Sequence, residues 1–302
     1  MSYVDAYYNK DKDIVNVVER IKGKRVYNDY PAWRTFYVKD PRGDHVSITG
    51  DKVRQIKCKR LKDLHKERKI NTGKTFYESD MKPEVKCLSE HYNGIESPTL
   101  NTAFFDIETD FDASRGFADP SDPFMPITAI TVHLQWLDLL VTLVIPPKAM
   151  RTGEGLVEAQ RICDQFPNTE LYLNEGDMLN DFMDVIEDAD VLTGWNSEGY
   201  DIPYTVNRQE TFDLFGRIHL DYLELYRKYT YHEMHSYALD TIGQHEVGER
   251  KVIYEGTLDQ LYNNDFFKFI EYNRQDTALL DKLDKKLRFI ELANEIAHDN
   301  TV

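Results

Sequence analysis

Four acidic residues of this chain stand where a folded protein would ordinarily bury apolar side chains. They are Asp106 and Glu108 around the apolar run 103–107, Asp201 after a Gly-Trp-Asn turn, and Asp276 in a helical stretch. A buried carboxylate without a partner costs several kcal/mol, so such residues require compensation. Divalent cations can provide it, and a ligand set of oxygen atoms without imidazole or thiolate favours Mg²⁺ or Mn²⁺.

The spacing of these residues places them on shared faces. Alternate residues of a strand point to the same side, which puts Asp106 and Glu108 on one face. Tyr272 and Asp276 are four residues apart and share one face of a helix. Each pattern alone has an ordinary structural explanation, because an Asp-x-Glu pair is most often a surface pair at a strand end. The ordered set with its local contexts is what indicates a metal-assisted active site.

The elements that must position these residues form an α/β pattern after residue 101. The predicted strands are residues 103–107, 127–134, 139–145 and 191–194. The predicted helices are residues 175–186, 203–212, 221–229, 237–246, 258–262 and 266–289. Residues 1–100 are typical of short strands and turns, with a strand and a short helix expected over 52–69. We therefore expect a β-rich leader followed by an α/β domain.

Composition excludes several classes of protein. The 302 residues suffice for two domains, and 41% hydrophobic with 30% charged residues is the profile of a folded, soluble chain. No apolar run approaches the roughly 20 residues of a membrane span, and no signal peptide is visible at the N-terminus. Cys58, Cys87 and Cys163 lack metal-type spacing. We expect a cytoplasmic protein without membrane association and without structural zinc.

Charge is divided unevenly along the chain. The net charge is −16, but residues 1–90 carry +7 (21 basic, 14 acidic) and the remainder carries −23 (16 basic, 39 acidic). The segment 52–69 alone has nine basic residues and two acidic ones. A solvated basic face and a nucleic-acid surface are both compatible with this segment. The acidic remainder can still act on a polyanion if its carboxylates bind divalent cations.

Three ordered segments resemble the exonuclease motifs of B-family DNA polymerases. They are FFDIETD (104–110), GWNSEGYDIPY (194–204) and YNRQD (272–276). The segments LDYLELYRKY (220–229) and SYALDTIGQHEVGERK (236–251) are similar to the corresponding parts of tailed-phage replicative polymerases, and FYESDMKPEVKCLSEHY (76–92) resembles the segment before the first motif. The resemblance covers residues from about 76 to 290. It implies an RNase H-like (DnaQ-type) 3′–5′ proofreading exonuclease domain behind a β-rich N-terminal domain.

The resemblance also assigns roles by motif position. Asp106 would touch both of two Mg²⁺ or Mn²⁺ ions, Glu108 and Asp276 would complete the first site, and Asp201 would support the second. Tyr272 would position the attacking water. Asn196 and Tyr200 would hold the terminal nucleotide, with Phe105 as a further candidate contact. The implied substrate is the single-stranded 3′ end of DNA at a primer-template, released as 5′-mononucleotides.

The chain departs from the family in two places. Only 15 residues (205–219) separate Tyr204 from Leu220, so the β-hairpin that many members insert there is expected to be short or absent. No segment resembles the polymerase palm motifs. We therefore expect residues 1–100 to form the N-terminal domain, 101–290 the exonuclease domain, and 291–302 the start of a connection toward a polymerase portion in the same or a separate chain.

Two other functions remain open at this stage. One is a free-standing DNA exonuclease, and the other is a non-catalytic DNA-binding or assembly subunit. The complete acidic motifs argue against the non-catalytic subunit, because an inactive exonuclease usually lacks at least one metal ligand. If the chain is phage-encoded, its expected location is the host cytoplasm.

Overall fold

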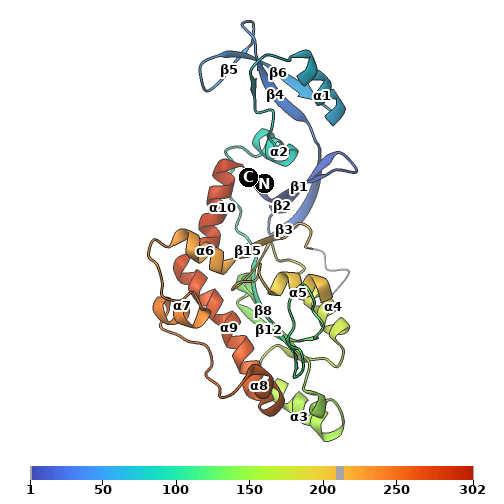
Figure 1. Cartoon of the computed structure of the whole chain (residues 1–302), viewed down its shortest axis with the longest axis vertical. Coiled ribbons are helices and arrows are strands. Elements are labelled where there is room, and N and C mark those ends of the chain that lie inside the picture. Colours follow the sequence, from blue (N-terminus) through green and yellow to red (C-terminus); the bar gives the residue numbers. More distant parts are fainter. Residues whose placement is uncertain (1, 209–213, 302) are drawn as a thin grey trace. The chain divides into compact units, whose positions relative to one another are not determined.

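The computed structural model describes residues 2–208 and 214–301. The chain forms two compact units (Figure 1). Unit 1 comprises Met1–Thr99 and Ala293–Val302, and unit 2 comprises Leu100–Leu292. Within the described ranges, every helix is too short or too polar to traverse a lipid bilayer.

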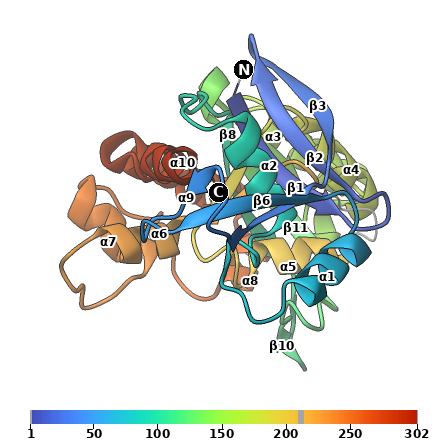
Figure 2. The same cartoon turned by 90° about the horizontal axis from the view of Figure 1, so that it is seen from above.

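Unit 1 contains two small antiparallel sheets, and the first is visible from above in Figure 2. It has the order β1-β2-β3, with β1 Ser2–Asn9, β2 Ile14–Ile21 and β3 Lys24–Pro31. The second has the order β5-β6-β4-β7, with β4 Arg34–Lys39, β5 His45–Val46, β6 Lys52–Cys58 and β7 Phe76–Tyr77. Helices α1 Leu61–Ile70 and α2 Pro83–His91 complete this part of the chain. The strand and short helix expected over 52–69 are confirmed by β6 and α1.

Unit 2 is built on a six-stranded mixed sheet of order β13-β12-β11-β8-β14-β15. Strand β11 is antiparallel to both of its neighbours, whereas β12–β13, β8–β14 and β14–β15 are parallel pairs. The strands are β8 Thr102–Thr109, β11 Ile127–Leu134, β12 Leu139–Val144, β13 Thr169–Leu171, β14 Val191–Gly194 and β15 Ile218–Asp221, with a small hairpin of β9 Phe111–Asp112 and β10 Gly116–Phe117. The mixed α/β class is confirmed.

Helices cover both faces of this sheet (Figures 1 and 2). On one face α9 packs against β8, β11 and β12, and on the other α4 packs against β11 and β12. The helices of unit 2 are α3 Gly153–Cys163, α4 Glu175–Val185, α5 Asp201–Arg208, α6 Tyr222–Tyr229, α7 Leu239–Glu246, α8 Leu258–Asn264 and α9 Phe266–Leu287, with short 3₁₀ turns at Gln135–Leu137 and Lys148–Met150. Helix α10 Phe289–Asn300 begins in unit 2, and its residues from Ala293 onward belong to unit 1. The two faces therefore have separate apolar cores.

Several element boundaries differ from the expected ones. Strands β11 and β14 have their predicted bounds, but α9 ends at Leu287 because Arg288 adopts a left-handed conformation (φ 54°), and α10 begins at the next residue. Helix α5 begins at Asp201, two residues earlier than expected. Residues 209–213, which include the expected end of that helix and part of the short 205–219 connection, lie outside the described residues.

Candidate functional site

The central strand β8 presents two chemically different faces. Phe105 and Ile107 belong to the core cluster that also contains Phe182 of α4. Asp106 and Glu108 alternate with them and point to the opposite face, where α9 lies. The side-chain amide of Asn273 on α9 donates to Asp106 Oδ2 at 2.9 Å. The apolar face thus anchors the strand, and the acidic face is directed at α9.

A β-bulge lies opposite the acidic end of β8. Ala129 pairs with Glu108 and Ile127 pairs with Thr109, so Thr128 of β11 is an extra residue between them. Its hydroxyl donates to the Glu108 carbonyl at 3.1 Å. Bulges locally bend a strand and redirect its side chains, and they are frequent next to active sites.

Asp276 of α9 completes a compact group of three carboxylates. One oxygen each from Asp106, Glu108 and Asp276 lies within 4.8 Å of the others. Glu108 and Asp276 are buried, with 8% and 2% of their surfaces exposed. Among the described residues, Asp276 Oδ1 is buried and has no hydrogen-bond partner. Such an oxygen next to two further carboxylates fits the ligand preference of a hard divalent cation.

Lys251 joins Asp276 and Tyr272, and sequence reasoning did not single it out. Its Nζ lies 2.6 Å from Asp276 Oδ2 and donates to the Tyr272 hydroxyl at 2.9 Å. Burial lowers the pKa of Lys251, but Asp276 and the other nearby negative groups raise it above its ordinary value overall. The only signal in the sequence was its position as the last residue of the segment 236–251, which resembles the family.

Asp201 approaches strand β8 from the side of β14, the neighbour of β8 opposite β11. It is the first residue of α5, it is 4% exposed, and its Oδ1 accepts the Ile107 backbone N–H at 3.1 Å. The turn before it needs a glycine, because a Cβ at Gly194 would lie 2.8 Å from the Phe105 carbonyl oxygen. The close approach of β14 to β8 therefore lets Asp201 bind the backbone of β8 at Ile107, the residue between Asp106 and Glu108 in the sequence.

The pKa values of these carboxyl groups reflect crowding. Burial raises the pKa of Asp106 well above its usual value, and the charges of Glu108, Asp201 and Asp276 raise it further. Burial and the charge of Asp276 raise the pKa of Glu108 to about 8, and burial raises that of Asp201 to about 7. The Lys251 ammonium partly opposes these shifts. One ammonium does not balance four carboxylates, so the site favours additional positive charge.

Tyr272 is held between Lys251 and a second tyrosine. Its ring makes an edge-on contact with Tyr254 at a centroid distance of 5.3 Å. Burial, Asp276 and Glu108 raise the pKa of Tyr272, which keeps its hydroxyl protonated at neutral pH. Because the Lys251 ammonium can only donate, the Tyr272 oxygen accepts that bond and its own proton remains available for another acceptor.

The expected nucleotide contacts differ in their surroundings. Asn196 is exposed and adopts φ 63° in the turn after β14, where its backbone N–H donates to Asp221 Oδ1 at 3.1 Å. Tyr200 is half-buried, with its hydroxyl 3.1 Å from Thr109 Oγ1. Phe105 has no exposed surface and packs 5.9 Å from Phe182. The expectation that Phe105 touches a nucleotide is not supported, because the core of unit 2 encloses its ring.

Comparison with known proteins identifies the family. The family described as DNA polymerase family B, exonuclease domain, matches residues 48–215, which is more than half of the chain. The chain belongs to this family. The match includes Asp106, Glu108 and Asp201 and ends before Tyr272 and Asp276, so the third motif depends on the resemblance of its own residues and on the geometry described above.

Two phage proteins are similar to this chain. The DNA-directed DNA polymerase of Escherichia phage RB69 is 27% identical over 268 residues, covering 71% of this chain and 29% of the relative. The DNA-directed DNA polymerase of Enterobacteria phage T4 is 29% identical over 157 residues, covering 41% of this chain and 18% of the relative. The matches thus span less than a third of either relative's length. The resemblance to phage B-family polymerases is confirmed.

The crowded carboxylates predict that Mg²⁺ stabilises the protein more at about pH 8 than at about pH 6. A carboxyl group whose pKa is raised on folding favours the folded state while protonated, and this stabilisation is lost as pH rises through the folded pKa. Between about pH 6 and 8 Glu108 changes from mostly protonated to about half ionised. Protons then compete less with Mg²⁺ for the carboxylates, and Mg²⁺ relieves a larger charge repulsion among them. Thermal unfolding with and without Mg²⁺ at the two pH values measures the difference.

Glu108→Gln is the matched variant for this prediction. Without Mg²⁺ at about pH 8 it should be more stable than the wild type, by roughly 1–3 kcal/mol, because a neutral amide of similar shape replaces a buried charge. It should also lose most of the response to Mg²⁺. An Mg²⁺ effect that is equal at both pH values, or unchanged in this variant, would show that the carboxylates do not bind the ion.

Proposed function

We propose that this chain is the metal-dependent 3′–5′ exonuclease portion of a phage-type B-family DNA polymerase. The observation that carries the proposal is a group of three carboxylates, from Asp106, Glu108 and Asp276, with one oxygen of each within 4.8 Å of the others. Asp201 accepts a hydrogen bond from the backbone of the same strand at Ile107. Its substrate is the single-stranded 3′ end of DNA. A phage polymerase would act in the host cytoplasm, and its palm portion would lie in the same or a separate chain.

The sheet supports the finer fold assignment within this proposal. An RNase H-like domain has a mixed sheet whose second strand runs against the others, and β11, the second long strand of unit 2, is antiparallel to β8 and β12. The acidic residues lie on β8, at the start of α5 and on α9. We therefore assign residues 101–290 to an RNase H-like exonuclease domain and residues 1–100 to a β-rich N-terminal domain.

The donor set fits Mg²⁺ or Mn²⁺, because all its members are carboxylate oxygens and one of them, Asp276 Oδ1, is buried without a partner among the described residues. Two such ions would supply a water of lowered pKa and charge relief on the leaving 3′ oxygen. Asp106 would touch both ions, Glu108 and Asp276 would complete one site, and Asp201 would support the other.

The remaining groups orient the reacting atoms. The Lys251 ammonium fixes the Tyr272 hydroxyl, which would orient the attacking water beside Glu108 when the ions are bound. The Lys251 ammonium also pairs with Asp276 and favours its charged form, although burial raises the pKa of Asp276 overall. Asn196 and Tyr200 hold the terminal nucleotide next to the acidic face. The 3′–5′ direction and the release of 5′-mononucleotides are inferred from the resemblance of the three motifs to those of the family.

The test is digestion of single-stranded DNA labelled at one end. We expect shortening from the 3′ end with Mg²⁺ or Mn²⁺, with nucleoside 5′-monophosphates as products. Degradation from the 5′ end, or full activity in EDTA, would contradict the proposal. Asp106→Ala should reduce the rate to background, because it removes the residue assigned to both ions.

Tyr272→Phe tests the division of roles in the same assay. This variant removes only a hydroxyl that orients water, so the rate should fall roughly 10- to 1000-fold and keep its dependence on Mg²⁺. Equal losses in Tyr272→Phe and Asp106→Ala would show that the roles are wrongly divided. Unfolding curves of the two variants serve as the control for folding.

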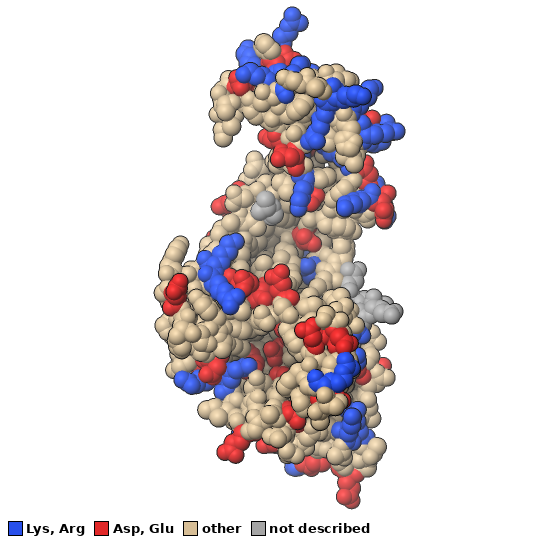
Figure 3. Space-filling model, viewed as in Figure 1, with Lys and Arg blue, Asp and Glu red and all other residues tan. Residues whose placement is uncertain are grey.

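The basic segment of unit 1 is a candidate surface for the strand beyond the cleaved end. Figure 3 shows Lys and Arg side chains gathered over the part of unit 1 that holds β6 and α1. Some of this charge is neutralised, since Arg54 pairs with Asp40 and Lys57 with Glu90. Among the described residues, the exposed lysines without an ion pair in this segment include Lys59, Lys62, Lys66 and Lys69.

Reversal of these four lysines to glutamate should weaken binding to long single strands. Each lost phosphate contact lowers the slope of log K against log salt by roughly 0.7, so the slope should fall by up to about 3. Cleavage of a trinucleotide should change little, because it is too short to need a second surface. The matched control reverses the exposed Lys10, Lys12, Lys22 and Lys24, which changes the net charge equally. An unchanged slope in the test variant would mean that the segment does not contact the strand.

A further inference from the structure

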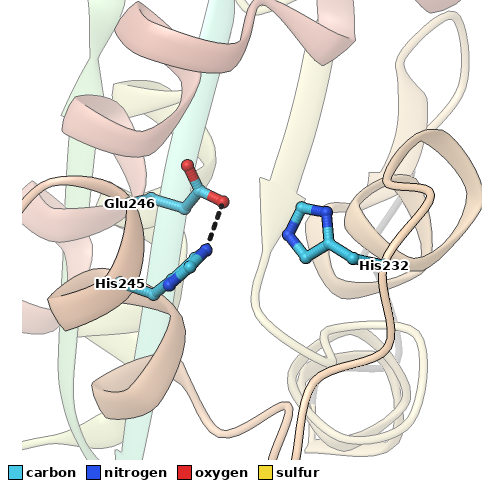
Figure 4. A group of neighbouring side chains, drawn as sticks. All are labelled: His232, His245 and Glu246. Carbon is cyan, nitrogen blue, oxygen red and sulfur yellow. Dashed lines mark ion pairs between the residues drawn. The ribbon is translucent and has the colours of Figure 1, made fainter.

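A second group of possible metal ligands lies at the C-terminal end of α7, apart from the four carboxylates of the proposed active site. It consists of His232, from the segment between α6 and α7, and of His245 and Glu246, the last two residues of α7. One ligand atom from each lies within 4.8 Å of the others. Figure 4 shows the His232 ring facing the His245–Glu246 pair from the opposite side.

Glu246 is the fixed member of this group. Its side chain is only 9% exposed, and both of its oxygens are held. The Tyr226 hydroxyl donates to Oε1 at 2.8 Å, and the Lys286 ammonium donates to Oε2 at 2.8 Å. A charged carboxylate is thus oriented before any ion arrives, as outer hydrogen bonds orient metal ligands.

The two imidazoles supply accessible nitrogen atoms next to this carboxylate. His245 Nε2 lies 3.8 Å from Glu246 Oε1, and the two histidine rings are 5.7 Å apart at an angle of 60°. Both histidines are exposed, so an ion can reach them from solvent. Because His232 comes from a different segment, its approach to the other two is a feature of the tertiary structure.

We propose that His232, His245 and Glu246 bind a Zn²⁺ ion that ties the segment before α7 to the end of that helix. Two imidazole nitrogens and one carboxylate oxygen are a ligand set that Zn²⁺ accepts, with water completing the coordination. Mg²⁺ prefers oxygen ligands and is not expected to compete here. The Lys286 ammonium stays on Oε2, which leaves a lone pair of Oε1 for the ion. Structural zinc was not expected because the cysteines lack metal-type spacing, and this site contains no cysteine.

The consequence of this binding is local rigidity next to the proposed exonuclease site. The segment that carries His232 also contains Tyr237, whose carbonyl accepts the Trp195 indole N–H at 3.0 Å. After α7 the chain reaches Lys251 within five residues, and the Lys251 backbone N–H donates to Asp240 of the same helix at 3.1 Å. The Zn²⁺ site therefore connects the segment that contacts Trp195 of the second motif with the helix that precedes Lys251, which contacts the third motif. The Zn²⁺ proposal does not depend on the exonuclease proposal.

Zn²⁺ titration of the full chain in a large excess of Mg²⁺ tests this inference, because Mg²⁺ competes for the carboxylate site. The wild type should bind one Zn²⁺ at this site. His232→Ala and His245→Ala should each weaken that binding at least 10- to 100-fold, the range found even for residues that only orient a ligand. His235→Ala, which removes an exposed histidine of the same segment, is the matched control and should leave the affinity unchanged.

Two further readouts separate the site from nonspecific binding. With Co²⁺ in place of Zn²⁺, the wild type should show the visible absorption of a low-coordinate ion, and both histidine variants should lose it. Hydrogen exchange of the segment 230–238 should slow with Zn²⁺ in the wild type and in His235→Ala, but not in His232→Ala or His245→Ala. In EDTA, the wild type and all variants should unfold at the same temperature, because the substituted histidines are exposed. Equal affinity in His232→Ala and the wild type, or equal loss in His235→Ala, would overturn the assignment.

Discussion

Repulsion among buried carboxylates is the constraint on which unit 2 depends. Asp106, Glu108, Asp201 and Asp276 are brought together from a strand and two helices, although each would be more stable in water. The fold partly compensates for this with Asn273 on Asp106, a backbone N–H on Asp201 and Lys251 on Asp276. The raised pKa values show that the compensation is incomplete. The proposed function follows from this constraint: divalent cations would stabilise such a site, and bound there they would supply the chemistry of phosphodiester hydrolysis.

The apolar side of the sheet makes this arrangement possible. Phe105, Ile107 and Phe182 fill the core between β8 and α4, which fixes the strand so that its acidic face cannot rotate away. On the other side, α9 supplies Phe269 and Ile270 to a second core and Asn273 and Asp276 to the acidic group. The length of α9 matters here, because one rigid helix carries both the anchoring and the functional side chains. The electrostatic cost is met by packing on both faces of the sheet.

Local spacing predicted the parts of the site that local geometry determines. The period of two placed Asp106 and Glu108 on one face, and the i, i+4 spacing placed Tyr272 and Asp276 together. The same period places Phe105 on the opposite face, where it packs against Phe182 of α4, so its expected contact with the nucleotide has no support in the structure. Lys251 and Asn273 could not be singled out, because their roles depend on contacts between distant segments. The approach of His232 to His245 has the same origin.

Anomalous scattering from Mn²⁺ in crystals that contain a 3′-terminal deoxynucleotide tests the central claim most directly. The account predicts two peaks about 3.5–4 Å apart on the acidic face of β8. One should contact Asp106, Glu108 and Asp276, and the other should contact Asp106 near Asp201. A 3′-terminal phosphodiester should lie against both, with the Tyr272 hydroxyl beside it. The account would be contradicted if Mn²⁺ bound only at exposed carboxylates and Asp276 remained paired with Lys251 without an ion beside it.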